Sequence, residues 1–424
     1  MVITRLKVSN FKSFKDIDVN LDDLNILIGG NASGKSNFIQ IFSFLRDICV
    51  YDLRNAISIQ GGDYIRNIKN KKSNVLSIEI HSNNGYNYPL DKNKVLSHLK
   101  VYETKYKFEI EFTKEDKIGF RILNDVLTYK FNFYSLENKN QKWSEGEKKG
   151  EGEVILLNNE GTINFQLKKQ PNKYSLVKNE LIPKFILKAL SEGIKSSNIM
   201  LETAFSIFPF RVLNDLFTRI SIYDLDPRLA KRSISISGKA DLEEDGSNIA
   251  IVLQKLLEDK DEKERLFNLI KNILPFVHDL GVESFVDTSV IMKLKETYSK
   301  RNFLPASLIS DGTITITALI VALYFTSGYL NIFEEPERNI HPSLISKVLD
   351  MMTETSKNKQ IIVTTHNPEF VKNTNLKNLL FISRDRNGYS TISRLDKKKE
   401  IKIFLENQIG IEELYIDNLL GEAQ

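Results

Sequence analysis

One glycine-rich stretch combines residue types and a spacing that suit phosphate binding. Residues 29–36 read GGNASGKS and match the pattern G-x-x-x-x-G-K-[ST]. Glycines let a loop turn its backbone N–H groups toward phosphate oxygens, and a helix that starts behind the loop adds partial positive charge. In such a loop Lys35 reaches the β- and γ-phosphates of ATP, and the hydroxyl of Ser36 binds Mg²⁺. The predicted nucleotide-binding residues are Gly29, Gly30, Asn31, Ala32, Ser33, Gly34, Lys35, Ser36 and Asn37.

Two adjacent carboxylates follow a second apolar run. Residues 333–342 read FEEPERNIHP, and neighbouring acids repel each other and lose solvation when they are covered. They therefore lie in water on a turn or face a held cation. In the second case Glu334 is the acid on the Mg²⁺ side, together with Ser36, and Glu335 is the base that positions and polarises the attacking water. Two solvated acids at the end of a strand remain the alternative.

Two more segments complete a set of four. Residues 308–313 read LISDGT and precede an apolar helical pattern, where an Asp-Gly turn with a serine helix cap is the plain interpretation. Residues 361–371 read IIVTTHNPEFV and place His366 directly after an apolar run. A single histidine in such a place has no role that the residues alone assign. The interpretation therefore depends on the order of the four segments along the chain.

In that order and context the segments resemble the ABC-type ATPases of the RecF, SMC and OLD (overcoming lysogenization defect) group. The resemblance covers approximately residues 1–60 and 300–385. It implies that Ser310 and Gly312 bind the γ-phosphate of an ATP held by a second protomer. It also implies that His366 contacts the γ-phosphate and helps to orient the water. The cofactors that it implies are ATP and Mg²⁺, and the oligomer is a homodimer closed around two ATP molecules.

The match to this family has departures. Residues 334–342 are similar to the OLD-type run D-E-P-E-x-x-L-H-P, with His341 in the part that crosses the dimer interface, but Glu334 stands where the family has aspartate. The extra methylene moves the carboxylate outward by about 1.5 Å. Mg²⁺ requires near-ideal octahedral geometry, so we expect ATP turnover to be slow. In the 308–313 segment Ile309 and Thr313 replace the family's leucine and glutamine. Lys12, in the opening segment NFKSF, is a further residue that the resemblance places near the nucleotide.

The elements that position these residues can be read from hydrophobic periodicity. Residues 24–30 are almost continuously apolar, as expected of a central strand that is covered on both faces, and a helix follows from near Gly34 to about Ile48. Residues 314–333 are long enough to cross a bilayer, but Gly328 divides them and polar residues interrupt them, so a buried helix, a turn and a buried strand explain them better. The predicted fold class is α/β: a P-loop NTPase with an ABC-type head, a mixed sheet flanked by helices, and a large inserted α+β domain.

The middle of the chain has a different pattern. Residues 73–174 read as short strands separated by polar loops, and residues 179–195 and 246–277 read as helical. We therefore predict a head built from residues 1–60 and 300–400, an inserted β-rich and then helical domain at 61–299, and a C-terminal tail at 401–424. The charged run 136–153 is interpreted as a hairpin tip. The acids Glu412 and Glu413 of the tail are interpreted as the solvated face of a closing helix.

Composition narrows the class of protein. The chain has 424 residues, enough for two or three domains, and a net charge of +4 that does not by itself indicate nucleic-acid binding. Cys49 is the only cysteine, which excludes an intrachain disulfide and fits a reducing compartment. The first residues lack the pattern of a secretory signal, so a cytoplasmic protein is expected.

Two functions compete at this stage. The first is an ATP-binding and hydrolysing homodimeric switch that senses a trigger and controls a separately encoded effector, a nuclease or a toxin, in bacterial anti-phage defence. The short tail leaves no room for the Toprim nuclease domain of OLD proteins, which favours a separate effector. The second is a RecF- or SMC-like ATPase that acts directly on DNA in repair or maintenance. Its candidate DNA contacts are Arg66, Lys69, Lys71, Lys72, Lys168, Lys169 and Lys173, although solvated lysines are the plainer interpretation. A membrane transporter subunit and a scaffold that binds ATP without hydrolysis are weaker options.

Overall fold

The protein packs as two compact units, each assembled from separate parts of the chain. The computed structural model describes residues 2–70, 73–83, 86–92, 95–113, 119–139, 142–169, 193–202, 211–284, 288–299, 302–397, 401 and 410–417. The first unit comprises Met1–Asp22, Asn37–Ile220 and Arg384–Ile392. The second unit comprises Asp23–Ser36, Ser221–Ser383 and Ser393–Gln424. The predicted division into head, inserted domain and tail follows other boundaries and stays a prediction.

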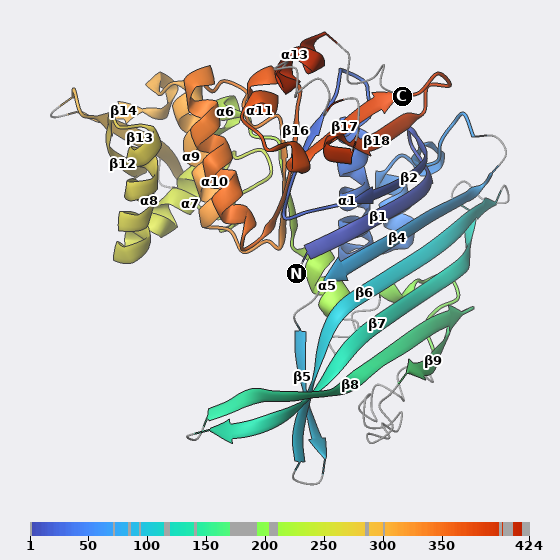
Figure 1. The fold of residues 1–424 in the computed structure, drawn as a ribbon. Helices are drawn as coiled ribbons and strands as arrows, with labels where there is room; N and C mark the ends of the chain where they lie inside the picture. The colour runs from blue at the N-terminus through green and yellow to red at the C-terminus, as the bar shows by residue number, and fades with distance from the viewer. Residues whose placement is uncertain are drawn as a thin grey trace. The chain divides into compact units, whose positions relative to one another are not determined.

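The first unit is built on a large antiparallel sheet (Figure 1). Its strands pair in the order β2-β1-β4-β6-β7-β8-β9, and β5 pairs with β6. Their bounds are β1 Val2–Phe11, β2 Phe14–Asn20, β4 Val75–Asn83, β5 Tyr86–Lys92, β6 Val95–Thr113, β7 Gly119–Lys139, β8 Lys142–Asn159 and β9 Thr162–Lys169.

The expectation of short strands in this region was wrong. Strands β6, β7 and β8 have 19, 21 and 18 residues. The side chains of β6 alternate strictly over residues 105–112, with apolar or aromatic groups buried and charged groups on the other face. An antiparallel sheet with one solvated face tolerates this alternation over any length, so polar residues do not mark the ends of its strands. The charged run 136–153 lies in the β7–β8 hairpin, as predicted, where Lys139 pairs with Lys142.

Helix α1 (Lys35–Val50) begins at the end of the glycine-rich loop and continues into the first unit. The apolar stripe predicted for it, Phe38, Ile41, Phe42 and Leu45, is buried. The ring of Phe44 packs 6.0 Å from that of Phe11 in β1, so the helix is fixed to the sheet by aromatic contact. The other short helices of this unit are α2 Leu53–Ile59, η1 Gly62–Ile65, η2 Met200–Glu202 and α5 Arg211–Thr218. Most of the predicted helix at 179–195 lies outside the described residues.

A buried carboxylate ties the segment around η2 to the sheet. Asp125 is fully buried on β7 and accepts hydrogen bonds from the Tyr106 hydroxyl (2.8 Å), the Asn158 amide (2.8 Å) and the backbone N–H of Met200 (2.7 Å). Burial raises the pKa of Asp125 to about 6 even though the three donors oppose this shift. The carboxylate is therefore well satisfied in hydrogen bonds but still disfavoured as an anion.

The second unit contains a sheet with strand order β10-β15-β16-β3-β17. The bounds are β10 Ile220–Tyr223, β15 Leu330–Glu334, β16 Gln360–Thr365, β3 Leu24–Ile28 and β17 Leu379–Arg384. Strands β15, β16, β3 and β17 are parallel, and every residue of β3 is buried, as predicted for a central strand. Strand β18 (Ser390–Arg394) spans the last boundary between the two units.

Helices and a small antiparallel sheet complete the second unit. The helices are α6 Pro227–Ala230, α7 Ile249–Glu258, α8 Lys260–Ile273, α9 Asp311–Tyr324, α10 Ile345–Ser356, α11 Pro368–Lys372 and α13 Ile411–Ile416. The 3-10 turns are η3 Ala306–Leu308, η4 Pro342–Leu344, η5 Leu376–Asn378 and η6 Leu395–Lys397. The small sheet comprises β11 Ile234–Ser235, β12 Val277–Ser284, β13 Ser289–Glu296 and β14 Leu304–Pro305.

The long helical pattern at 246–277 is divided into α7 and α8 by Asp259. Its carboxylate caps α8 by accepting from the N–H groups of Asp261 and Glu262, both at 2.9 Å. A residue that caps a new helix takes an extended backbone conformation, which ends the previous helix.

The stretch of bilayer length is a buried helix followed by a buried strand, as interpreted from its sequence. Residues 313–323 of α9 are all buried in the core of the second unit, and β15 follows after a break at residues 326–328. Within the described ranges, the helices are too short or too polar to cross a membrane.

We expect the buried Asp125 to make stability depend on pH in an unusual direction. A folded-state pKa near 6 exceeds the ordinary value of 3.8, so the unfolded chain releases this proton first and stability falls as pH rises between about 4 and 6. Asp125→Asn removes this loss. Its stability relative to wild type, measured by urea unfolding, should therefore increase over that window by about 3 kcal/mol at most.

Asp18 supplies a control of opposite sign. Its hydrogen bond with Arg5 lowers the pKa of Asp18, so Asp18→Asn should lose stability relative to wild type as pH rises. Equal slopes for the two variants would contradict the prediction for Asp125.

Candidate nucleotide site

The glycine-rich loop lies between the end of β3 and the start of α1, as the sequence predicted. Ala32 and Gly34 take positive φ values of 59° and 119°, so the loop uses the left-handed conformations that the motif requires. The Lys35 ammonium donates hydrogen bonds to the carbonyl oxygens of Gly29 (2.7 Å) and Gly30 (3.0 Å). Burial lowers the pKa of Lys35, against the opposing effect of nearby carboxylates. The lysine is thus held on the loop with its charge close to Glu335 and Glu337, which follow β15.

Strand β15 brings the first of the two adjacent acids to this loop. The Ser36 hydroxyl donates to Oε2 of Glu334 at 3.4 Å, although the two residues are 298 positions apart in the chain. Burial raises the pKa of Glu334, with a smaller contribution from the negative charge of Asp224. The structure therefore joins the two residues that the sequence analysis assigned to the metal.

Mg²⁺ suits this donor set, because a hydroxyl and a carboxylate are both hard oxygen ligands. Among the described residues no three side chains of the His, Cys, Asp or Glu type are grouped as a metal site. Mg²⁺ at a triphosphate usually completes its coordination with nucleotide oxygens and water.

The second acid, Glu335, is held in a strained turn. Its φ is 44°, which is uncommon for a residue with a side chain, and its backbone N–H donates to the carbonyl of Thr364 at 2.8 Å. Oε1 lies 2.8 Å from Nδ1 of His366, and Oε2 accepts from Nε of Arg338 at 2.9 Å. Burial raises the pKa of Glu335, but the hydrogen bonds from His366 and Arg338 outweigh it and hold the pKa below its ordinary value. The carboxylate is therefore ionised and accepts both hydrogen bonds.

This protonation state fixes the tautomer of the histidine. A carboxylate can only accept, so Nδ1 of His366 carries the proton that is shared with Glu335. Nε2 is then the ring nitrogen that remains for other partners, and the side chain is half exposed, at 53%. The predicted base and the predicted histidine are thus in direct contact.

Sequence reasoning missed several residues that shape this site. Nη1 of Arg338 donates to Asp224 at 2.8 Å, so a carboxylate from the segment after β10 orients the guanidinium that contacts Glu335. The hydroxyl of Tyr415, in α13, lies 3.3 Å from the carbonyl of Gly29 and 3.4 Å from that of His366. Arg338 could have been found from the sequence, because it stands three residues after Glu335 and can pair with it locally. No local sequence pattern marks Asp224 or Tyr415.

The closing helix predicted for the tail has one buried side and one solvated face. Ile411 and Leu414 of α13 belong to the core of the second unit, and α13 packs against α11. Glu413 is exposed and Glu412 is half-buried, as expected of the solvated face. The tail residues that the structure describes are 401 and 410–417, and the rest of the predicted tail lies outside them.

The LISDGT segment forms a helix start. Ser310 is exposed, caps α9, and accepts from the N–H of Thr313 at 3.2 Å. Gly312 is tightly packed, since a Cβ atom there would lie 2.6 Å from the carbonyl oxygen of Asn339. Among the described residues, Ser310 contacts Thr313 and Gly312 contacts Asn339, both outside the glycine-rich loop. Their assignment to the ATP of a second protomer stays a prediction.

The remaining candidate residues have local partners. The ring of His341 caps η4, and its Nδ1 lies 2.8 Å from the Ser343 hydroxyl. The Lys12 ammonium donates to the side-chain oxygen of Gln40 at 2.7 Å within the first unit. Neither contact tests the roles that the resemblance implied.

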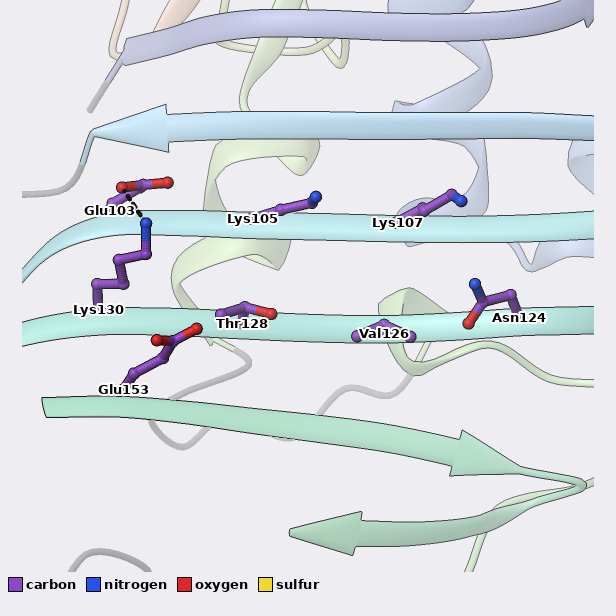
Figure 2. A pocket seen from close by; sticks show the side chains of 8 residues that line it. All are labelled: Glu103, Lys105, Lys107, Asn124, Val126, Thr128, Lys130 and Glu153. Carbon is purple, nitrogen blue, oxygen red and sulfur yellow. Dashed lines mark hydrogen bonds and ion pairs between the residues drawn. The ribbon is translucent and has the colours of Figure 1, made fainter. Parts of the chain in front are cut away.

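The solvated face of the large sheet carries a hollow of about 440 Å³ (Figure 2). It is lined by Glu103, Lys105, Lys107, Asn124, Val126, Thr128, Lys130 and Glu153. Each of its three lysines is paired with a carboxylate. Lys105 lies 3.2 Å from Glu79, Lys107 lies 2.8 Å from Glu109, and Lys130 lies 3.0 Å from Glu103. The charge of each lysine in the hollow is therefore balanced by a nearby carboxylate.

Among the described residues proposed for DNA contact, Arg66, Lys69 and Lys169 have local partners and Lys168 is exposed, so direct DNA contact stays a prediction. Arg66 is bonded to Asp63 and stacks on Phe112, and the Lys69 ammonium donates to the Asn387 carbonyl. Lys169 pairs with Glu151 at 3.0 Å. Lys71, Lys72 and Lys173 lie outside the described residues.

Comparison with known proteins places this site in a family. The family model described as "AAA domain, putative AbiEii toxin, Type IV TA system" matches residues 24–372, which is most of the chain and includes the loop, both acids and the histidine. The chain therefore belongs to this family of AAA domains. The predicted recognition of an AAA-family ATPase is confirmed by this match, and the parallel sheet with its glycine-rich loop confirms the predicted α/β P-loop fold class.

Individual relatives are more distant. A segment of 110 residues is 27% identical to endonuclease GajA of Bacillus cereus (strain VD045), and it covers 26% of this chain and 18% of that protein. The chain thus matches less than a fifth of that relative's length.

The SMC head bound to the C-winged helix domain of ScpA aligns over 94% of this chain and 99% of its own, with a TM-score of 0.49 and 14% identity. The SMC head domain from Thermotoga maritima aligns over 93% and 99%, with a TM-score of 0.41 and 14% identity. The family assignment rests on the family model, not on these structures.

We expect the first two glycines of the loop to differ sharply in their tolerance of a side chain. A Cβ atom at Gly29 would lie 2.3 Å from the carbonyl oxygen of Ile382, whereas a Cβ at Gly30 meets nothing within 4 Å. Gly29→Ala should shift the loop at a cost of about 1–3 kcal/mol and weaken ATP binding about tenfold or more. Gly30→Ala is the matched control and should bind normally. Titration with a fluorescent ATP analogue measures both, and equal affinities would contradict the prediction.

Proposed function

We propose that the chain binds ATP with Mg²⁺ and hydrolyses it to ADP and phosphate. The observation that carries this proposal is the meeting of three distant segments in one unit. Ser36 contacts Glu334, and Glu335 contacts His366, beside the ammonium of Lys35. The family assignment to AAA domains supports it independently. Substrate and metal would be held by residues 29–37 and by Glu334.

The roles of the residues follow from their charges. Lys35 and the N-terminus of α1 neutralise the phosphates, and backbone N–H groups of the loop orient them. Ser36 and Glu334 would hold Mg²⁺, which supplies charge stabilisation at the β- and γ-phosphates. Glu335, ionised and fixed on both oxygens, orients the attacking water and accepts its proton. His366 directs Nε2 toward the γ-phosphate.

We further propose that the active species is a homodimer, in which Ser310 and Gly312 complete the ATP site of the partner subunit. The exposure of Ser310 and of the neighbouring Leu308, which is 68% exposed, supports this arrangement. ATP would favour the closed dimer because both surfaces contact it only there, and hydrolysis would reopen it.

The dimer would act as a switch on a separately encoded nuclease or toxin in bacterial anti-phage defence. Support comes from the resemblance to stand-alone OLD-like ATPases, from the family's description as a putative toxin, and from the similarity of one segment to an endonuclease.

The base assignment is tested with two substitutions. Glu335→Gln should keep ATP binding, reduce turnover by about a hundredfold or more, and accumulate dimer with ATP, because the amide cannot accept the proton. Lys35→Ala should lose both ATP binding and the formation of the dimer with ATP. Phosphate release and light scattering measure the two properties. Wild-type turnover by Glu335→Gln would rule out the assignment of the base.

The composite site is tested by mixing two inactive variants. Ser310→Arg blocks the surface offered to the partner, and Lys35→Ala disables the subunit's own loop. A mixed dimer contains one intact site of two, so an equal mixture should recover about a quarter of wild-type ATPase activity if subunits pair at random, and about half if only the mixed dimer forms. Each variant alone should remain inactive. If the mixture is as inactive as its components, Ser310 does not act across a dimer.

A further inference from the structure

The second unit buries a third acid that the proposed reaction does not use. Glu337 lies two residues after Glu335 and is only 7% exposed. Its Oε1 is hydrogen-bonded to the Thr365 hydroxyl, while Oε2 has no hydrogen-bond partner among the described residues. Burying a carboxyl group with one unsatisfied oxygen costs free energy, so its retention here calls for a physical explanation.

The direction of the hydrogen bonds can be deduced. The backbone N–H of Asn367 donates to Oγ1 of Thr365 at 2.9 Å, and an N–H can only donate. The proton of the Thr365 hydroxyl therefore remains available, and the carboxylate form of Glu337, which can only accept, receives it. Burial raises the pKa of Glu337, against the effect of this hydrogen bond. The relay thus runs from Asn367 through Thr365 to Glu337.

This relay spans the residue that contacts the base. His366 lies between Thr365 and Asn367, so both neighbours of the histidine are fixed by the same hydroxyl. Two residue pairs join the turn after β15 to the end of β16. Glu335 contacts His366, the first residue after the strand, and Glu337 contacts Thr365, the last residue of the strand. The two segments are therefore braced at two adjacent points.

We propose that Glu337 is a positioning residue, which acts through Thr365 to hold the turn that presents Nδ1 of His366 to Glu335. The inference rests on the proposed ATPase function, because it assigns the supporting residues of that site. Glu337 itself does not touch the reacting atoms.

Two matched pairs of variants separate positioning from general stability. Glu337→Leu keeps the volume but removes the acceptor, and Glu337→Gln keeps a carbonyl oxygen for Thr365. Thr365→Val removes the hydroxyl, and Thr365→Ser keeps it. We expect Glu337→Leu and Thr365→Val to lower kcat about 10- to 100-fold with the KM for ATP within about threefold of wild type. Glu337→Gln and Thr365→Ser should stay within about fivefold of wild-type kcat.

A double-mutant cycle tests the route through the histidine. In a His366→Ala background, Glu337→Leu and Thr365→Val should each lower kcat by less than about threefold, because the group that they position is gone. The same fractional loss in both backgrounds would overturn the proposal, as would a loss confined to KM. If Glu337→Leu does not fold, the Thr365 pair decides the question alone.

A readout independent of turnover distinguishes failure of this inference from failure of the proposed function. The chain has five histidines, so the ring signals of labelled histidine can be resolved by NMR and that of His366 assigned from the His366→Ala spectrum. Glu337→Leu should shift the His366 signal and weaken its Nδ1–H hydrogen bond, while Glu337→Gln should leave it near its wild-type position. An unchanged His366 signal in Glu337→Leu overturns the positioning role, whether or not the protein hydrolyses ATP.

Discussion

The parallel pairing of β3, β16 and β15 is the constraint on which the candidate site depends. Thr365 pairs with Ile28, and Glu334 pairs with Thr364, so the three strands end at the same edge of the sheet. The residues that follow them in the chain, at positions 29, 335 and 366, must then lie close together. Parallel strands require long connections, which is why the parts of one site can be separated by about three hundred residues in sequence.

A site that holds several carboxylates close together must keep them in different protonation states. Burial raises the pKa of Glu334 and Glu337, whereas the partners of Glu335 overcome burial and lower its pKa. The environment thus separates three chemically identical groups: Glu335 is an ionised acceptor with two donors, whereas the anionic forms of Glu334 and Glu337 need a cation or a further donor. The guanidinium of Arg338 binds Glu335 and also lowers the pKa of Glu334, while the charge of Lys35 lies near Glu335 and Glu337.

Local sequence was sufficient for the parts of the site that depend on local geometry. A glycine-rich loop between an apolar run and a helical pattern, and acids at the end of another apolar run, are each visible within about ten residues. Asp224 and Tyr415 are not, because each reaches the site from a segment whose own sequence has no chemical pattern. The sequence did not indicate that Glu337 is buried, because two neighbouring acids and an arginine suggest a solvated turn. The lengths of β6, β7 and β8 were missed because alternation continues through charged residues.

Gly312 shows how one residue can satisfy two explanations. The motif interpretation requires a glycine for close approach to a phosphate, and the structure supplies a second reason, because a side chain at this position would collide with the carbonyl of Asn339. Asn339 itself takes a φ of 64°, and its neighbour Arg338 holds Glu335. The exposed start of α9 and the turn that carries Glu335 are therefore packed against each other through backbone atoms, with no room for a side chain between them.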